Sequence, residues 1–415
     1  MADRTAEPNR FAAETAEIAT RTGPVEILVG IMAGDHAGTI VRVAEMTASG
    51  LASRFPDRRS CLLVLVAGSH DGTAEALQAW RAHAPAIPPI EVLNLGGAAD
   101  PSRLFRVLLE TACRLEAAAC AFVQADLLGL TPERIGRLLA PVLAGQAEAV
   151  LPAYTRTATE GTLTSNLLAP LTRALFGKRI QQLLGGCGAF SGGPLASFLA
   201  DSQWDRDLGP HGIEVWLILE ALASGRPLVE VALGGRRVSP APGQPDLPTT
   251  LTHAVGPLFA LLERYHGNWM EVRGSVPVPC LGNGSPSSDR GEDAHTERMV
   301  RAFRMGVKDL LPVWEQIVPE ETLGQLYPLG LLPPEEFEFP VRLWARIVCK
   351  FALAHHERRL PREHLLRALT PLYLGRVAAF LREARAGGDG SLAPLLEAIG
   401  LAFEAEAEML RERWR

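Results

Sequence analysis

The sequence predicts an α/β protein with a mostly parallel sheet, followed by an all-helical extension. Three observations carry this prediction. Short apolar runs alternate with helical patterns through the first 154 residues, a polar loop follows each run, and only helical spacing remains after residue 298. Strands that alternate with helices form βαβ units, and such units build a parallel sheet that is covered on both faces.

Five strands are expected in the first part of the chain, each followed by a polar loop. Two of the helices that follow have clear starts, because Asp100 and Thr131 each precede a proline at the first helical position. The expected strands are Val25–Gly34, Cys61–Val66, Pro89–Gly96, Cys120–Leu127 and Ala147–Tyr154.

The second part alternates less regularly. Residues 163–177 have helical spacing, "LLGGCGAFSGG" is expected to be a glycine-rich loop that leads into a helix, and "PLVEVALGG" at 227–235 is a sixth strand. Residues 274–298 are rich in Gly, Pro, Ser and charge without periodicity, which is typical of a linker that proteases cut first. The expected bounds are an N-terminal arm at 1–24, an α/β domain at 25–272, a linker at 273–298 and a helical extension at 299–415.

Composition and charge exclude several classes of protein. Hydrophobic residues make up 47% of the 415 residues, which is ample for a large core, and the net charge of −6 argues against a nucleic-acid partner. No apolar run is long enough to span a membrane, and the first residues have no apolar signal core, so we expect a cytoplasmic protein. The six scattered cysteines form no Cys-x-x-Cys pair and indicate buried thiols in a reducing compartment.

Two acids and two loops are the candidates for chemistry. Asp126 ends an apolar run, at the position where ligands bind in many α/β enzymes, although an acid there also serves as an ordinary turn residue. Glu214 lies early in a helix, where the helix dipole alone favours an acid. "GSHDGT" at 68–73 is a tight polar loop suited to a phosphate or base, and the glycines of "LLGGCGAFSGG" allow a backbone to approach a ligand.

The order of these segments resembles glycosyltransferases of the GT-A fold. "GSHDGT", then "QAD" after a strand, then "LLGGCGAFSG", then "HGIEVWL" is most like the branch that makes mannosylglycerate, glucosylglycerate or glucosyl-3-phosphoglycerate. The resemblance covers most of the chain, and residues 344–380 look like the helical extension of bacterial members.

This resemblance implies transfer of a hexose from a nucleotide-diphosphate sugar to a small hydroxy acid such as glycerate or 3-phosphoglycerate. In such enzymes two acids in a D-x-D pattern hold Mg²⁺ or Mn²⁺ against the diphosphate. The implied roles are catalysis by Glu214 and Asp126, donor binding by Asp71, Gly68, Gln124 and Asp126, acceptor binding by Gly185, Gly186 and His211, and metal binding by Asp126 alone.

Several landmarks of the branch are replaced in this chain, and the metal shell lacks about two of its three ligands. Gln124 stands for the first acid of D-x-D, Cys187 for the acid after the glycine pair, and Val238 or Ser239 for a late histidine. Val66 and Ala67 stand where the branch usually has two acids before the "GSHDGT" loop, and Ala99–Pro101 stands where it has a segment with a lysine. The branch also has an arginine before the glycine pair, which "IQQLLGG" lacks.

These departures leave four readings open. The first is an active transferase, and the second is an inactive homologue that acts as a binding or regulatory partner. The third is a transferase that needs no metal, in which "KRIQQ" at 178–182, or Arg236 and Arg237, neutralise the phosphate charge. Glycosidase chemistry, which needs two carboxylates, has only Asp126 with Glu214. The helical tail either packs on its own sheet domain or forms a homodimer.

Overall fold

The chain forms two compact units, each assembled from segments that are far apart in the sequence. The computed structural model describes residues 8–84, 88–97, 100–205, 208–239, 246–282, 296–333, 335–387 and 392–414. Unit 1 contains the described residues within 1–154, 184–244 and 279–284, and unit 2 those within 155–183, 245–278 and 285–415. The expected bounds 25–272 and 299–415 follow chain order and stay a prediction about which segments fold independently.

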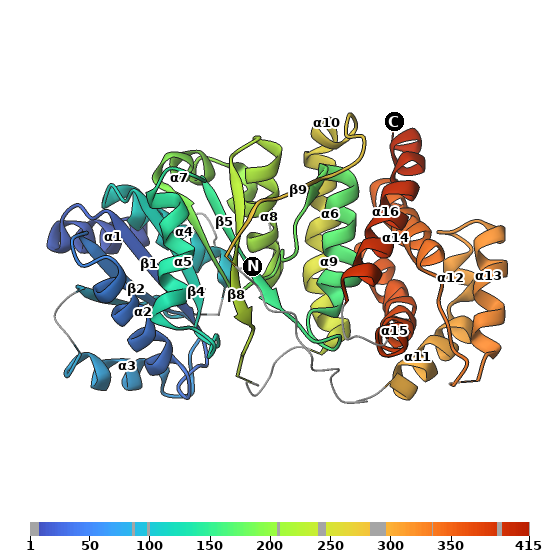
Figure 1. Ribbon diagram of the computed structural model, residues 1–415, viewed down its shortest axis with the longest axis horizontal. Helices are drawn as coiled ribbons and strands as arrows, with labels where there is room; N and C mark the ends of the chain where they lie inside the picture. Colours follow the sequence, from blue (N-terminus) through green and yellow to red (C-terminus); the bar gives the residue numbers. More distant parts are fainter. Residues whose placement is uncertain are drawn as a thin grey trace. The chain divides into compact units, whose positions relative to one another are not determined.

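Unit 1 is built on an eight-stranded sheet in the order β10-β8-β5-β7-β4-β1-β2-β3. β1 pairs in parallel with β2 and β4, β2 with β3, and β8 with β10, which confirms the α/β class and the mostly parallel sheet (Figure 1). The strands are β1 (Ile27–Ala33), β2 (Ser60–Val66), β3 (Ile90–Asn94), β4 (Ala119–Gln124), β5 (Ala149–Thr155), β7 (Cys187–Ser191), β8 (Leu228–Gly235) and β10 (Cys280–Leu281).

The glycine-rich segment corrects one expectation. Within the expected loop "LLGGCGAFSGG", residues Cys187–Ser191 form β7, an antiparallel strand between β4 and β5. The run is short, contains Gly188 and has a pair of glycines on each side, so period and propensity gave no strand signal. Burial against both neighbours makes it a strand, and its antiparallel direction brings the turn before it to the carboxyl end of β4.

Helices cover both faces of this sheet. On one face lie α2 (Ile40–Arg54), α3 (Thr73–Arg81) and α5 (Pro132–Leu143), and on the other α4 (Pro101–Arg114), which packs with α1 (Pro8–Thr22), α7 (Gly192–Leu199) and α8 (Gly209–Ala223). Every residue of β1 and β2 is buried, as expected for strands covered on both sides. A β-carbon on Gly30 would lie 2.5 Å from Cδ1 of Leu108, so only glycine lets α4 approach β1 this closely.

The predicted helix starts are confirmed. Asp100 accepts a hydrogen bond from the Ser102 amide at 3.0 Å, and the Thr131 hydroxyl accepts one from the Arg134 amide at 3.3 Å. Each cap satisfies an amide that has no partner within its own helix. Residues 8–22 of the expected N-terminal arm form α1, which is packed against α4.

Unit 2 is helical apart from two short strands, β6 (Lys178–Arg179) and β9 (Val276–Pro277). From residue 299 onward the described residues form helices and connecting turns but no strand, which confirms the helical extension. Within the described parts, no helix is long and apolar enough to cross a membrane. The helices are α6 (Ala169–Phe176), which follows the π-helical turn Thr164–Leu168, α9 (Leu247–Arg264), α10 (His266–Trp269), α11 (Thr296–Asp309), α12 (Leu311–Trp314), α13 (Glu320–Leu331), α14 (Val341–His356), α15 (Arg362–Ala386) and α16 (Ala393–Arg413).

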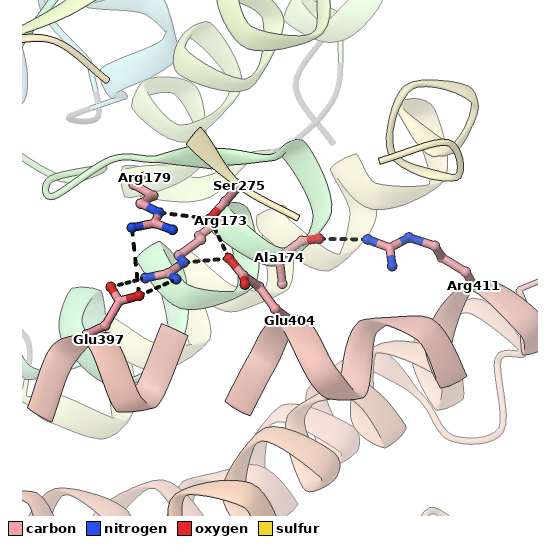
Figure 2. A network of polar contacts seen from close by, with 7 residues as sticks. All are labelled: Arg173, Ala174, Arg179, Ser275, Glu397, Glu404 and Arg411. Carbon is pink, nitrogen blue, oxygen red and sulfur yellow. Dashed lines mark hydrogen bonds and ion pairs between the residues drawn. The ribbon is translucent and has the colours of Figure 1, made fainter. Parts of the chain in front are cut away.

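A polar network fixes the last helix of unit 2, α16, against α6 (Figure 2). The Arg173 guanidinium donates to both oxygens of Glu397, at 2.7 and 2.9 Å, and through Nε to Glu404 at 2.7 Å. Farther along α16, Arg411 donates to the carbonyl of Ala174 at 2.7 Å. The Arg173 side chain is only 8% exposed, so these bonds replace its water, and its pKa is raised chiefly by the hydrogen bonds with Glu397.

Candidate functional site

One edge of the unit 1 sheet gathers most of the predicted site residues. The carboxyl ends of the parallel strands β1, β2 and β4 lie there, together with the turn that precedes antiparallel β7. We call the loops at this edge the rim: residues 34–39, 67–72, 125–130, 184–186 and 236–239. Asp126 comes two residues after β4, at the place that the sequence predicts for it.

Hydrogen bonds join the rim loops to one another. The Gln124 amide donates to the Gly186 carbonyl at 2.7 Å, and the Ser239 amide donates to the Asp126 carbonyl at 3.0 Å. The His70 amide donates to Asp35 at 2.6 Å. Segments that are distant in the sequence therefore form one connected surface at the ends of the strands.

Asp71 holds two of these loops together. Its carboxylate accepts from the Ala37 amide at 2.8 Å and from the amide and hydroxyl of Thr73 at 3.1 and 2.5 Å. Burial opposes ionisation, but these hydrogen bonds and one from Ser69 outweigh it and lower the pKa of Asp71. Gly68 begins this loop with a φ of +60°. Asp71 thus shapes the loop in which the resemblance expects the donor.

Glu214 fixes the glycine turn before β7. It lies in α8 with 4% of its surface exposed, and its Oε1 accepts from the amides of Gly185 at 2.8 Å and Gly186 at 3.2 Å. Gly186 has a φ of +70°, a conformation that favours glycine. Burial raises the pKa of Glu214 to about 7, against the two backbone hydrogen bonds and the charge of Arg236, while the charge of Asp126 adds to the rise. His211 lies one turn earlier in α8 and is half buried.

Cys187 follows this turn, and its thiol is not a reactive nucleophile. Its sulfur lies 3.3 Å from the Tyr154 hydroxyl, which donates to the Gly185 carbonyl at 3.1 Å. Burial raises the pKa of the Cys187 thiol to about 12, so the thiolate needed for nucleophilic attack does not form near neutral pH. The expectation that the cysteines are buried is wrong for Cys280, which is exposed, and for Cys113, which is half buried.

Three side chains lie on or beside the same rim, and two of them keep a buried atom without a hydrogen-bond partner among the described residues. A β-carbon on Gly186 would lie 2.9 Å from Oε1 of Gln124 and 3.3 Å from Nη2 of Arg236, so both side chains border this turn. Oδ1 of Asp126 and Nε of Arg236 are buried, and neither has a hydrogen-bond partner among the described residues. The rim therefore presents an acceptor and a cationic donor that are not paired with each other.

Sequence reasoning missed Arg134. This residue follows the Thr131 cap in α5, and its Nη2 donates to the Gly235 carbonyl at 3.0 Å. Burial lowers the pKa of Arg134, and its Nη1 is buried without a partner among the described residues. No motif marks it, because an arginine in the first turn of a helix is common, and only the fold brings it beneath the end of β8.

The rim residues do not fit the D-x-D cation site that the resemblance implies. Mg²⁺ and Mn²⁺ need several oxygen ligands, and of the D-x-D pair the chain keeps one carboxylate, Asp126, with the neutral amide of Gln124 in the other place. The other rim carboxylates, Asp35 and Asp71, already accept from backbone amides of neighbouring loops. Cys187 is protonated, and the Arg236 charge borders the same turn. Across the residues that the structure describes, no group of three or more His, Cys, Asp or Glu side chains is placed to hold a metal ion.

Of the remaining landmarks, Ala67, Val238 and Ser239 lie on the rim, and the others lie elsewhere in the fold or outside the described residues. Ser239, at the place of the late histidine, does lie beside Asp126 through their backbone hydrogen bond. The segment 178–182 belongs to unit 2, where Arg179 donates to Ser275 at 3.0 Å (Figure 2). Ala99 lies outside the described residues, and Pro101 begins α4.

Comparisons with known proteins find similarity in structure only. No protein-family model matches the sequence, and no curated protein matches it. Among solved structures, the chain is similar to glucosyl-3-phosphoglycerate synthase from Mycobacterium tuberculosis in complex with Mn²⁺, UDP and phosphoglyceric acid, at 20% identity over 60% of this chain and 82% of that one, with a TM-score of 0.44. The same enzyme with Mn²⁺, UDP and glucosyl-3-phosphoglycerate is 19% identical over 61% and 84% of the two chains, with a TM-score of 0.44.

A further solved structure, described as a mycobacterial protein, is 22% identical over 61% of this chain and 78% of that one, with a TM-score of 0.44. The synthases belong to the branch that the sequence motifs resemble. Similarity at this level carries no information on the ligands of this chain, which its own residues must indicate.

Proposed function

We propose that the rim of unit 1 binds a nucleotide-diphosphate sugar and transfers its hexose to a small hydroxy acid such as glycerate or 3-phosphoglycerate. The observation that carries the proposal is that two rim atoms, Asp126 Oδ1 and Arg236 Nε, are buried and have no hydrogen-bond partner among the described residues. A buried polar atom without a partner costs about 1–3 kcal/mol, so such atoms at a sheet edge favour a ligand that pairs them.

A nucleotide sugar has both kinds of partner. Its ribose and hexose hydroxyls donate to a carboxylate, and its phosphate oxygens accept from a guanidinium. The loop that Asp71 and Gly68 shape is suited to the nucleoside, and Gln124 and Asp126 to the sugar-bearing part. We assign the acceptor to the glycine pair and His211, as the resemblance implies.

Glu214 has two roles in this proposal. It holds the turn of Gly185 and Gly186 in place, and a pKa near 7 suits a group that takes a proton from the acceptor hydroxyl at neutral pH. In the reaction the acceptor oxygen forms a bond to the anomeric carbon, the bond from that carbon to the diphosphate breaks, and the hydroxyl proton leaves to the base.

The test is a transfer assay with a panel of donors, UDP-glucose, ADP-glucose, GDP-glucose and GDP-mannose, each with glycerate and with 3-phosphoglycerate. Mass spectrometry reports the new glycoside and the released nucleoside diphosphate. We expect product from at least one pair and a rate for Glu214→Gln that is lower by about 100-fold or more, as for loss of a general base. Glu220→Gln, on the same helix, is the matched control with an unchanged rate.

Two outcomes would contradict the proposal. Binding of a donor without transfer to either acceptor would favour an inactive homologue, and hydrolysis without an acceptor would favour glycosidase-like chemistry. An unchanged rate in Glu214→Gln would remove the proton-transfer role while leaving the transferase in place.

A further inference from the structure

We infer that the diphosphate of the donor is neutralised by the guanidinium of Arg236 rather than by a divalent cation. The inference rests on the proposed function and concerns the same rim. It selects one of the cationic groups that the sequence left open, and it gives the missing D-x-D acid a physical reason.

The backbone around Arg236 is held on both sides. Before it, Arg134 donates to the Gly235 carbonyl at 3.0 Å, and after it the Gly129 amide donates to the Arg237 carbonyl at 3.0 Å. The Ser239 amide then donates to the Asp126 carbonyl. The root of the Arg236 side chain is therefore fixed against the loop that carries Asp126, as a residue that must meet a ligand requires.

The guanidinium of Arg236 keeps its bonding capacity. No hydrogen bond or ion pair involves it among the described residues, and its Nε is buried and unpaired. A guanidinium presents two parallel N–H groups to a phosphate, which binds it in fixed geometry as well as by charge. Arg236 thus has a buried N–H group available to an anion, and within the described chain its charge acts on Glu214.

The other arginines that the sequence suggested are less suitable. Arg237 is exposed, and Arg179 lies in unit 2, where it donates to Ser275. Nη2 of Arg134 already donates to the Gly235 carbonyl. Arg134 therefore positions the backbone before Arg236 and adds positive charge, and we do not assign it the diphosphate contact.

The neutral Gln124 fits this arrangement better than an acid would. Its Oε1 and the Arg236 guanidinium border the same turn at Gly186. A carboxylate at 124 would pair with Arg236 and cancel its charge, whereas an amide leaves the charge available. Asp126 then accepts from a hydroxyl of the ligand instead of holding a metal ion.

The experiment is calorimetry with inorganic pyrophosphate, UDP, ADP and GDP, each in EDTA and again with Mn²⁺. We expect one nucleoside diphosphate to bind in EDTA within about twofold of its affinity with Mn²⁺. Arg236→Gln should weaken that nucleotide and pyrophosphate by about tenfold to a hundredfold, the effect of losing a charge-assisted hydrogen bond, and Arg236→Lys by less. Arg114→Gln removes the same charge from the far end of α4 and should change neither affinity, and unchanged melting temperatures show that the variants fold.

The outcomes separate this inference from the proposed function. A nucleoside diphosphate that binds only with Mn²⁺, or equally well to Arg236→Gln, overturns the inference and leaves the transferase proposal standing. Pyrophosphate that binds through Arg236 in EDTA, while no nucleotide binds more tightly, supports the anion site and overturns the nucleotide. Absence of all binding overturns both.

Discussion

Two groups of arginines and carboxylates in this protein differ in how completely they are paired. In unit 2, the Arg173 guanidinium donates hydrogen bonds to both Glu397 and Glu404 (Figure 2). Each of these three charged side chains therefore contacts one of opposite charge. In unit 1, Arg236 and Asp126 each keep a buried atom without a partner in the described chain. We call the first group closed, because its charged side chains are paired with one another, and the second open, because it keeps buried atoms that are not paired within the described chain.

Whether a charged side chain is paired within the chain distinguishes a structural role from a ligand-binding role better than its being an arginine or a carboxylate does. A buried charge that is fully paired within the chain holds elements together and has nothing left for a ligand. A buried polar atom without a partner within the chain destabilises the free protein, and at the edge of a sheet a ligand can pair it. The closed group joins α6 to α16, and the open group lies at the ends of the strands.

The largest expected effect is on the closed group. Arg173→Met should lower the free energy of unfolding by about 3 kcal/mol, because Glu397 and Glu404 lose the buried guanidinium and keep only Arg179 and Ser275 as partners. The value lies at the low end for a buried pair because Glu397 is 44% exposed and water partly replaces the arginine. Urea denaturation measures it, and the corresponding change in the open group, Arg236→Met, should cost less than about 0.5 kcal/mol.

A triple variant sharpens this prediction. Arg173→Met combined with Glu397→Gln and Glu404→Gln should recover most of the loss, because the charges of all three residues are removed together. Arg179 also loses Glu397 in this variant, but its side chain is 40% exposed and water replaces the contact. If the triple variant is as unstable as Arg173→Met, the loss comes from packing. If Arg236→Met costs as much as Arg173→Met, the comparison between closed and open groups is wrong.

The next effect is a pH dependence from Glu214, whose pKa rises from 4.5 to about 7 on folding, chiefly through burial. Between these values the folded protein binds more protons than the unfolded chain. The stability that protonated Glu214 contributes is therefore full below pH 4.5 and is lost as the pH rises through 7. The loss is about 3 kcal/mol at most, from the size of the pKa change.

Glu214→Gln isolates this dependence. Its amide oxygen can still accept from the amides of Gly185 and Gly186, but it does not titrate. Urea midpoints at pH 5 and pH 8 should therefore diverge, with the variant gaining stability over the wild type at the higher pH. If the difference in stability between Glu214→Gln and the wild type is the same at pH 5 and pH 8, burial does not raise the pKa of Glu214.

The sequence predicted the parts of the fold that depend on local pattern. Strands β1 and β2 are apolar throughout and the caps at Asp100 and Thr131 are local, so period and capping found them. β7 was missed because its strand character comes from its two neighbours and not from its own glycine-containing residues. The assembly of each unit from distant segments has no local signal at all.

The site was predicted only in part, for a related reason. Position after a strand predicted Asp126 at the rim. Glu214 and the glycine pair were candidates from their local sequence, and the resemblance supplied their roles. The hydrogen bonds from that pair to Glu214, and the position of Arg134 beneath β8, depend on contacts between segments far apart in the chain. Charge that is left unpaired is visible only once every possible partner has been placed.

The smallest expected effect on stability is at Asp126, and it decides whether this acid is a ligand group or a turn residue. Asp126→Ala should change the free energy of unfolding by less than about 0.5 kcal/mol, because it removes an unpaired atom and keeps the carbonyl that accepts from Ser239. Nucleoside diphosphate binding in EDTA should weaken by about tenfold, the cost of a lost hydrogen bond to a charged group. Asp57→Ala, in the exposed turn before β2, is the control that should change neither quantity. A loss of stability of about 2 kcal/mol with unchanged nucleotide binding would instead make Asp126 a turn residue, since only a structural acceptor has that signature.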